Sequence, residues 1–216
     1  MTDRLKKIYQ KIPRCETFAD IGCDHGYIAK AMLMGSKCKN VIVSDVSEKC
    51  LAKAQTLLSR FIENGVARSV VSDGFDKVGR CDCALIAGMG GEEICSILDR
   101  ARKTASLPEN LVLQPMKNCD KVRKCALSNG YFFVSDAVFY SAGKYYNLIV
   151  LKKGDDFLSD EEIEFGRDNV KNPSPDFKKM IKEEYLKLSK FLENESISQS
   201  VREELLQKTE KLEKYV

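Results

Sequence analysis

The chain has 216 residues, 44% of them hydrophobic, so it is long enough for one domain with an additional segment and too apolar to be wholly disordered. No apolar run approaches the ~20 residues that a membrane span needs, and the first ten residues lack the apolar core of a secretory signal, which favours a cytoplasmic protein. The net charge of +3 is uneven, because residues 153–216 carry 12 basic and 16 acidic side chains.

Short β-branched runs alternate with helical stretches over the first 150 residues, and this alternation predicts a parallel sheet covered by helices. The early runs are almost entirely apolar, as is typical of strands buried on both faces. The last two runs, separated by Ser141-Ala142-Gly143, are typical of an antiparallel pair that closes the sheet. The predicted strands are Thr17–Gly22, Asn40–Asp45, Ala67–Ser72, Asp82–Ala87, Asn110–Gln114, Tyr131–Val138 and Tyr145–Lys152.

Four helices are expected between these strands, over residues 26–34, 47–64, 91–104 and 117–128. The predicted fold class is therefore α/β, a doubly wound Rossmann-like domain with a seven-stranded sheet.

After residue 153 the sequence no longer alternates between strand-like and helical segments. We therefore predict one domain over residues 1–153 and a helical hairpin over residues 154–216. Ser159 and Glu162 have the spacing of a capping box, and Ser174-Pro175 starts a longer helix. Ser200 and Glu203 predict the cap of a further helix. We expect the two long helices to form a coiled-coil-like projection rather than to pack flat on the first domain.

Acidic residues end three successive predicted strands, where open α/β sheets bind their ligands. Asp20 ends the first strand, Asp45 ends the second and precedes Val46, and Asp73 follows the third and precedes Gly74. A carboxylate at the second position suits ribose hydroxyls, and one at the third suits an adenine amino group. The glycines of the first loop, Gly22 and Gly26, permit a close approach to the ligand.

The same strand-end acids also occur in enzymes that bind a dinucleotide, so this class is the alternative to a methyltransferase. It needs a glycine-rich loop that places a pyrophosphate on a helix N-terminus, whereas here the loop has Asp24 between its two glycines. A carboxylate disfavours a phosphate and tolerates a sulfonium cation. The residues therefore favour S-adenosylmethionine as the cofactor.

Glycines and polar residues after the later strands complete the candidate site. Ala87, Gly88 and Met89 are predicted to contact the cofactor. The glycines and polar residues that follow leave space above the sheet for a flat methyl-accepting group. Basic residues near the N-terminus are candidate contacts to RNA phosphates. The predicted substrate-binding residues are Gly90, Gly91, Gln114, Pro115, Lys7 and Arg14.

The cysteines indicate neither disulfides nor a metal. There are nine of them, and they are scattered without a C-x-x-C pair, beside the single histidine, His25. We therefore expect reduced thiols and no metal.

Three segments together resemble the bacterial tRNA adenine(22)-N1 methyltransferases (TrmK family). They are Asp20-Ile21-Gly22-Cys23-Asp24-His25-Gly26-Tyr27, Ala87-Gly88-Met89-Gly90-Gly91 and Leu113-Gln114-Pro115. The family commonly has alanine where this chain has Gly26, and often glutamate where it has Asp45. The resemblance implies methyl transfer from S-adenosylmethionine to N1 of a tRNA adenine, with tRNA as partner and Asp24 as the candidate catalytic residue.

On this reading Asp24 accepts a hydrogen bond from the adenine amino group, and Tyr27 stacks on or hydrogen-bonds the base. His25 is either a further catalytic residue or a structural hydrogen-bonding group. A methyltransferase of a small molecule or protein, and a non-catalytic tRNA-binding protein, stay open as alternatives. A monomer is favoured over an oligomer.

Overall fold

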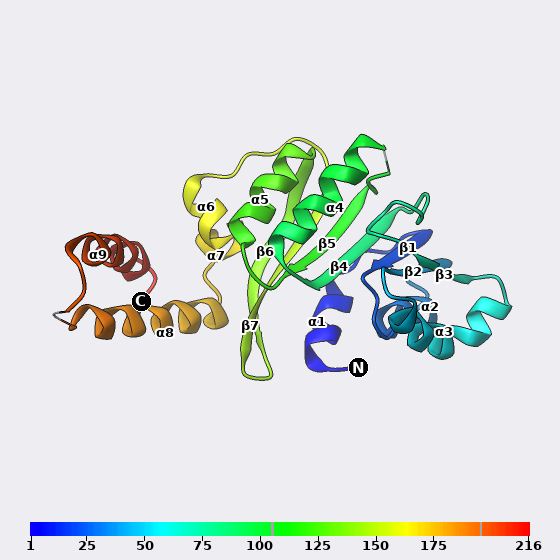
Figure 1. Cartoon of the computed structure of the whole chain (residues 1–216), viewed down its shortest axis with the longest axis horizontal. Coiled ribbons are helices and arrows are strands. Elements are labelled where there is room, and N and C mark those ends of the chain that lie inside the picture. The colour runs from blue at the N-terminus through cyan, green and yellow to red at the C-terminus, as the bar shows by residue number, and fades with distance from the viewer. Residues whose placement is uncertain (105, 195) are drawn as a thin grey trace.

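The computed structural model describes residues 1–104, 106–194 and 196–216. Its centre is a seven-stranded sheet of order β3-β2-β1-β4-β5-β7-β6, in which the first five strands are parallel and β7 is antiparallel to both of its neighbours (Figure 1). This is the predicted fold class. The strands are β1 Thr17–Ile21, β2 Asn40–Asp45, β3 Ala67–Val71, β4 Cys83–Met89, β5 Asn110–Pro115, β6 Tyr131–Ser141 and β7 Lys144–Lys153.

Helices cover both faces of the sheet. One apolar core joins the sheet to α1, α2 and α3, and a second joins its other face to α4, α5 and α6. The bounds are α1 Asp3–Lys11, α2 Tyr27–Met34, α3 Glu48–Glu63, α4 Gly91–Lys103, α5 Cys119–Ser128, α6 Asp160–Phe165, α7 Arg167–Lys171, α8 Pro175–Leu192 and α9 Gln199–Glu213.

Helix α1 has no counterpart among the predicted elements. It is short and highly charged, and it begins where the Thr2 hydroxyl accepts a hydrogen bond from the Leu5 amide. Ile8 and the following Ile12 are fully buried in the core. These few apolar residues anchor the helix to the face of the sheet that α2 and α3 also cover, and its first residues become part of the site described below.

The strand order changes direction at β1, because β2 and β3 lie on one side of it and β4 and β5 on the other. Loops that leave β1 and β4 therefore diverge, which opens a space at the carboxyl ends of these two strands. The expected antiparallel pair is also present: β6 and β7 are joined at Ala142 and Gly143, which both have positive φ angles (48° and 83°).

The C-terminal helices follow the predicted caps with one correction. Ser159 and Glu162 form the capping box of α6, and the Ser174 hydroxyl caps α8. Helix α9, however, is capped by Ser198, whose hydroxyl accepts from the Val201 amide, so Ser200 lies inside the first turn and the predicted cap is wrong. Both serines follow the polar segment that connects α8 to α9, and the sequence alone does not separate them.

Helices α8 and α9 run as an antiparallel pair that extends away from the sheet (Figure 1). The root of the pair is packed through an aromatic and aliphatic cluster that includes Val138 of β6. The described residues of the pair therefore form a projection with a fixed base (Figure 1). The buried members of the cluster are Val138, Phe177, Ile181, Leu212 and Tyr215.

Candidate functional site at the carboxyl ends of the strands

A cavity of about 340 Å³ lies at the divergence point between β1 and β4. Three elements form its walls: the start of α1, the loop from β1 to α2, and the end of β4. The lining residues are Thr2, Arg4, Leu5, Asp20, Gly22, Cys23, Asp24, His25, Gly26, Tyr27, Ile28, Leu85 and Ala87.

The β1–α2 loop is held in a tight turn by its two glycines, Gly22 and Gly26, whose φ angles are +73° and +72°. The amides of Gly22 and Cys23 donate to the Ser44 carbonyl at 2.8 and 2.9 Å, which ties the loop to β2. A Cβ at Gly22 would collide with the Met89 side chain. The loop therefore brings its backbone close to the end of β4, with Met89 lying across it.

Asp20 lies near the end of β1 and is only 9% exposed. Burial raises the pKa of this carboxyl to about 7, and the neighbouring Cys23 thiol offsets part of the effect. Within the described ranges no lysine, arginine or histidine nitrogen lies within 4 Å of the carboxylate. Asp20 is thus a buried acid that faces the cavity without a cationic partner.

The other two strand-end acids lie on the adjoining rim, since β2 and β3 follow β1 in the sheet. Asp45 accepts a hydrogen bond from the Ser47 amide at 2.7 Å, and Asp73 accepts from Arg100 of α4 at 2.5 Å. Val46 is 68% exposed beside the first of these acids. Gly74 is buried, and a Cβ there would lie 2.7 Å from Ile97, so it serves packing.

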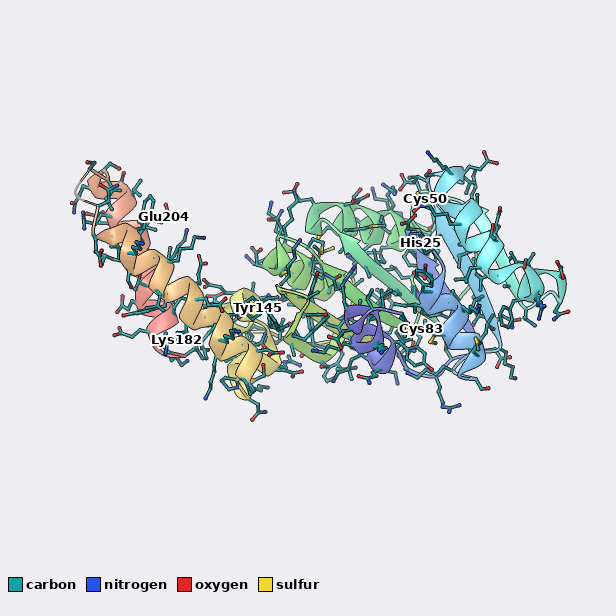
Figure 2. All side chains as sticks on the ribbon, turned by 90° about the horizontal axis from the view of Figure 1, so that it is seen from below. His25, Cys50, Cys83, Tyr145, Lys182 and Glu204 are labelled. Atoms are coloured by element: carbon teal, nitrogen blue, oxygen red, sulfur yellow. The ribbon has the colours of Figure 1, made fainter. Side chains whose placement is uncertain are left out.

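Asp24 lies at the mouth of the cavity, with both carboxylate oxygens engaged. One accepts from Lys53 Nζ at 2.7 Å, and the other lies 3.0 Å from His25 Nε2. The Lys53 ammonium holds the pKa of Asp24 below its usual range, so the carboxylate is ionised at neutral pH. The ring of His25 stacks on that of Tyr27 with centroids 5.3 Å apart, and Figure 2 labels His25 in the same region of the molecule as Cys50 of α3.

The glycine-rich segment after β4 divides between two roles. Gly88 has φ +81° beside a register shift in the β4–β5 pairing, and it lies under the Arg4 side chain. Gly91 is buried against the next loop, where a Cβ would lie 2.6 Å from the carbonyls of Lys117 and Asn118. At Gly90, which precedes it, a Cβ would lie 3.2 Å from Lys117 Cε, so the two glycines predicted to bind substrate face this loop.

Gln114 is fully buried, together with Pro115. Its Oε1 accepts from Arg4 Nε at 2.9 Å and also from Arg4 Nη2, and its Nε2 donates to the Pro115 carbonyl at 3.0 Å. The polar atoms of the amide are therefore already engaged inside the protein.

The two basic residues predicted to contact RNA do not line the cavity. Lys7 donates to the Tyr140 carbonyl at 2.8 Å, and Arg14 donates to the Ser36 carbonyl at 2.9 Å. Their contact with phosphates stays a prediction.

Sequence reasoning gives Lys53 no role, and it groups Arg4 with the basic N-terminal residues expected to contact phosphates rather than with the cavity. Lys53 lies on α3, 29 residues after its partner Asp24, and Arg4 lies 110 residues before Gln114. No local pattern reports such distant contacts; the basic N-terminal segment was the only available signal for Arg4.

In the part of the chain that the structure describes, no group of three or more His, Cys, Asp or Glu side chains is arranged to hold a metal ion. Among those same residues, no helix combines the length and apolarity required to cross a membrane.

Comparisons with known proteins agree with this architecture. The chain is 27% identical to the tRNA (adenine(22)-N(1))-methyltransferase of Bacillus subtilis over 157 residues, which span 72% of this chain and 66%, just under two thirds, of that relative. Among solved structures, M. capricolum TrmK in complex with S-adenosyl-homocysteine superposes with a TM-score of 0.87 at 24% identity, covering 100% of this chain and 97% of the other. The B. subtilis m1A22 tRNA methyltransferase TrmK gives 0.84 at 22% identity, covering 100% and 98%.

These two structures support the fold, because their identity to this chain is low. A family profile described as a methyltransferase domain matches residues 1–149, well over half of the chain and nearly all of the sheet with its covering helices. The match includes every residue that lines the cavity. The chain therefore belongs to the methyltransferase domain family.

Proposed function

We propose that this protein transfers a methyl group from S-adenosylmethionine to N1 of an adenine in tRNA, at position 22 in the D-arm region. The observation that carries the proposal is the row of acids Asp20, Asp45 and Asp73 at three neighbouring strand ends, beside a cavity whose mouth holds Asp24. The choice of tRNA adenine follows the name of the B. subtilis relative and the motif resemblance.

The residues present fit the donor. A buried carboxylate without a cationic partner, Asp20, suits an ammonium group, and Asp45 at the end of β2 suits ribose hydroxyls. The ionised Asp24 would repel the pyrophosphate of a dinucleotide and attract a sulfonium cation. The electrostatics of the loop thus favour the methyl donor over a nicotinamide coenzyme.

The bound donor supplies an electrophilic methyl group. The protein's own contribution is to align the acceptor nitrogen with it and to stabilise the positive charge that the adenine gains. Asp24 is suited to this role, because its carboxylate accepts a hydrogen bond from the N6 amino group and can then accept the proton. Lys53 and His25 each contact one of its oxygens, and each oxygen keeps a second lone pair that can accept from the base. Tyr27, 46% exposed at the mouth, offers a ring for the base to stack on.

The direct test is incubation of the protein with methyl-labelled S-adenosylmethionine and unmodified tRNA, followed by mapping of the labelled nucleoside. We expect 1-methyladenosine at position 22, and no labelling of a tRNA in which that adenine is replaced by guanine. Label at another nucleotide would refute the assignment of the target.

The same experiment separates the two alternatives. A methyltransferase of a small molecule or protein would leave tRNA unlabelled and would show no salt-sensitive tRNA binding. A non-catalytic tRNA-binding protein would bind tRNA with strong salt dependence and transfer no methyl group.

A further inference from the structure

Lys53 lies on the second turn of α3, and its ammonium group connects that helix to the β1–α2 loop. Nζ donates to Asp24 Oδ1 at 2.7 Å, across 29 residues of sequence. Packing beside the pair fixes this distance, because Ala54 is fully buried and a Cβ at Gly26 would lie 3.2 Å from the Ala54 Cβ. The helix and the loop therefore meet directly next to the ion pair.

The contacts of Asp24 set the orientation of its carboxylate, which would otherwise rotate over a broad range. Lys53 contacts Oδ1, and His25 Nε2 lies 3.0 Å from Oδ2, so both oxygens are held. Two more titratable side chains lie beside the pair, the Cys50 thiol of α3 and the Tyr27 hydroxyl. The pairing with Asp24 raises the pKa of Lys53, so its ammonium group stays charged at neutral pH.

The exposure of the pair indicates that the fold does not depend on it. The side chains of Lys53 and Asp24 are 47% and 52% exposed, and exposed ion pairs contribute little to the free energy of unfolding because water screens them. Asp24 nevertheless lines the mouth of the cavity, where the proposed function brings it to the adenine. An oriented carboxylate at that place favours a role in catalysis over a role in stability.

We propose that Lys53 is a positioning residue for methyl transfer, which holds the Asp24 carboxylate in one orientation so that a free lone pair accepts from the adenine N6 amino group. The inference rests on the proposed function, in which Asp24 meets the adenine. The charge of Lys53 itself disfavours a cationic adenine, so the residue contributes orientation rather than attraction. Its removal should therefore slow the reaction less than removal of the Asp24 carboxylate.

Single-turnover methyl transfer from S-adenosylmethionine to unmodified tRNA, at saturating concentrations of both, measures this role in the full chain. We expect Lys53→Met to lower the rate about 10-fold, as for loss of one charge-assisted hydrogen bond at an exposed position. The affinities for tRNA and for S-adenosylhomocysteine should stay within about 3-fold, because Lys53 is expected to touch neither. Lys53→Arg restores a cation and a donor, so its rate should return to within about 3-fold of the wild type.

The matched control is Arg60→Met, which removes an exposed cation two turns further along α3 and should leave the rate and both affinities unchanged. Thermal unfolding of each variant reports whether it is folded under the conditions of the assay.

Substitution in an Asp24→Asn background shows whether Lys53 acts through Asp24. There, Lys53→Met should lower the remaining rate by less than about 2-fold, because the carboxylate that it orients is already gone. The pair is also measured without any activity, since the carboxyl carbon of Asp24 can be titrated by NMR. Because Lys53 holds the pKa of Asp24 below its usual range, Lys53→Met should raise that pKa. An unchanged pKa would show that the pair does not form in solution and would overturn the proposal.

Three kinetic results would also overturn the role of Lys53. A further loss of about 10-fold in the Asp24→Asn background means that Lys53 acts independently of that carboxylate. Weaker tRNA binding with a smaller salt dependence and an unchanged rate at saturation assigns its charge to an RNA phosphate. A rate for Lys53→Met equal to or above that of the wild type means that the ammonium group does not assist. If the wild type itself transfers no methyl group to tRNA, the proposed function falls together with this role, whereas the other results remove the role of Lys53 alone.

Discussion

The carboxylate of Asp24 is exposed, ionised and held by two side chains that contact both of its oxygens. Replacing it by asparagine keeps the shape and removes the charge that stabilises a cationic adenine. We expect Asp24→Asn to lower the rate of methyl transfer to tRNA by more than ~100-fold while leaving the affinity for S-adenosylhomocysteine, which lacks the sulfonium charge, within about 3-fold. Single-turnover transfer and calorimetry measure the two quantities separately.

The control for this variant is Asp155→Asn, which neutralises an exposed aspartate far along the chain in the segment after β7. It should leave both quantities unchanged. Full turnover by Asp24→Asn would show that another group acts on the adenine.

Asp20 makes donor binding depend on pH. Burial raises its pKa to about 7 in the free protein, and a bound ammonium group favours the ionised form and lowers that pKa again. Below pH 7 binding must therefore release a proton, and affinity for S-adenosylhomocysteine should fall as the pH is lowered from 7 to 5.5, by up to about tenfold per pH unit. Above pH 8 the carboxyl is already ionised, and no proton is released.

Calorimetry in two buffers of different ionisation enthalpy measures the released protons directly. At pH 6 we expect close to one proton for the wild type and none for Asp20→Asn. The same proton release in both proteins would assign the titrating group elsewhere.

The acids of the site were predictable from sequence, whereas the cations were not. Asp20, Asp45 and Asp73 follow apolar runs, and parallel strands carry their ends to one edge, so strand prediction alone brings them together. Arg4 and Lys53 lie on helices that are distant in sequence from their partners in the site. Tertiary packing alone brings them to those partners. The contact between Gln114 and Arg4 is likewise not predictable, because 110 residues separate the two.

The N-cap of α9 lets the stability effects of two neighbouring serine substitutions be compared. The Ser198 hydroxyl accepts the Val201 amide hydrogen, and Ser200 lies in the first turn with its hydroxyl 3.2 Å from that of Ser198. Ser198→Ala should therefore destabilise α9 by about 1 kcal/mol, and Ser200→Ala by a few tenths of that amount. Amide hydrogen exchange in α9 measures both variants under identical conditions; equal protection in the two would contradict the assigned cap.

The strands were predicted to within one to three residues because most of them are buried on both faces and carry almost continuous apolar runs. Helix α1 escaped prediction because Leu5, Ile8 and Ile12 are its only aliphatic anchors in a charged segment. Its helical state depends on burial against the sheet, which is a tertiary effect. The element that sequence reasoning missed is the one that supplies Arg4.

At the scale of the whole molecule, a buried ion pair ties the C-terminal helices to the sheet. Arg123 of α5 is fully buried and pairs with Asp136 of β6 at 2.7 Å. Its Nη1 also donates to the carbonyls of Ile163 and Glu164 at the end of α6. Removing α6 would take away the carbonyl groups that accept from Arg123, so we expect α6 to belong energetically with the sheet, although residue 153 is the predicted boundary.

The segment after β7 also protects β6, which is the edge strand of the sheet. Side chains from this segment accept hydrogen bonds from successive β6 amides, which otherwise would be free to pair with another chain. The acceptors are Asp156 for Phe133, Asp168 for Asp136, Asn169 for Val138 and Asp176 for Tyr140. The edge is thereby closed by residues that follow position 153.

These contacts predict where the chain can be cut. A fragment of residues 1–172 keeps Asp156, Asp168, Asn169 and the carbonyl groups that accept from Arg123, so it should fold cooperatively and keep the oligomeric state of the full chain. A fragment of residues 1–153 exposes the β6 edge and a buried ion pair together, and we expect it to unfold at a temperature at least about 10 °C lower or to aggregate. Light scattering and thermal unfolding of the two fragments, compared with the full chain, decide the matter. If the shorter fragment proves as stable as the longer one and keeps the same oligomeric state, the domain boundary lies at residue 154, and α6 and α7 belong with the projecting helices.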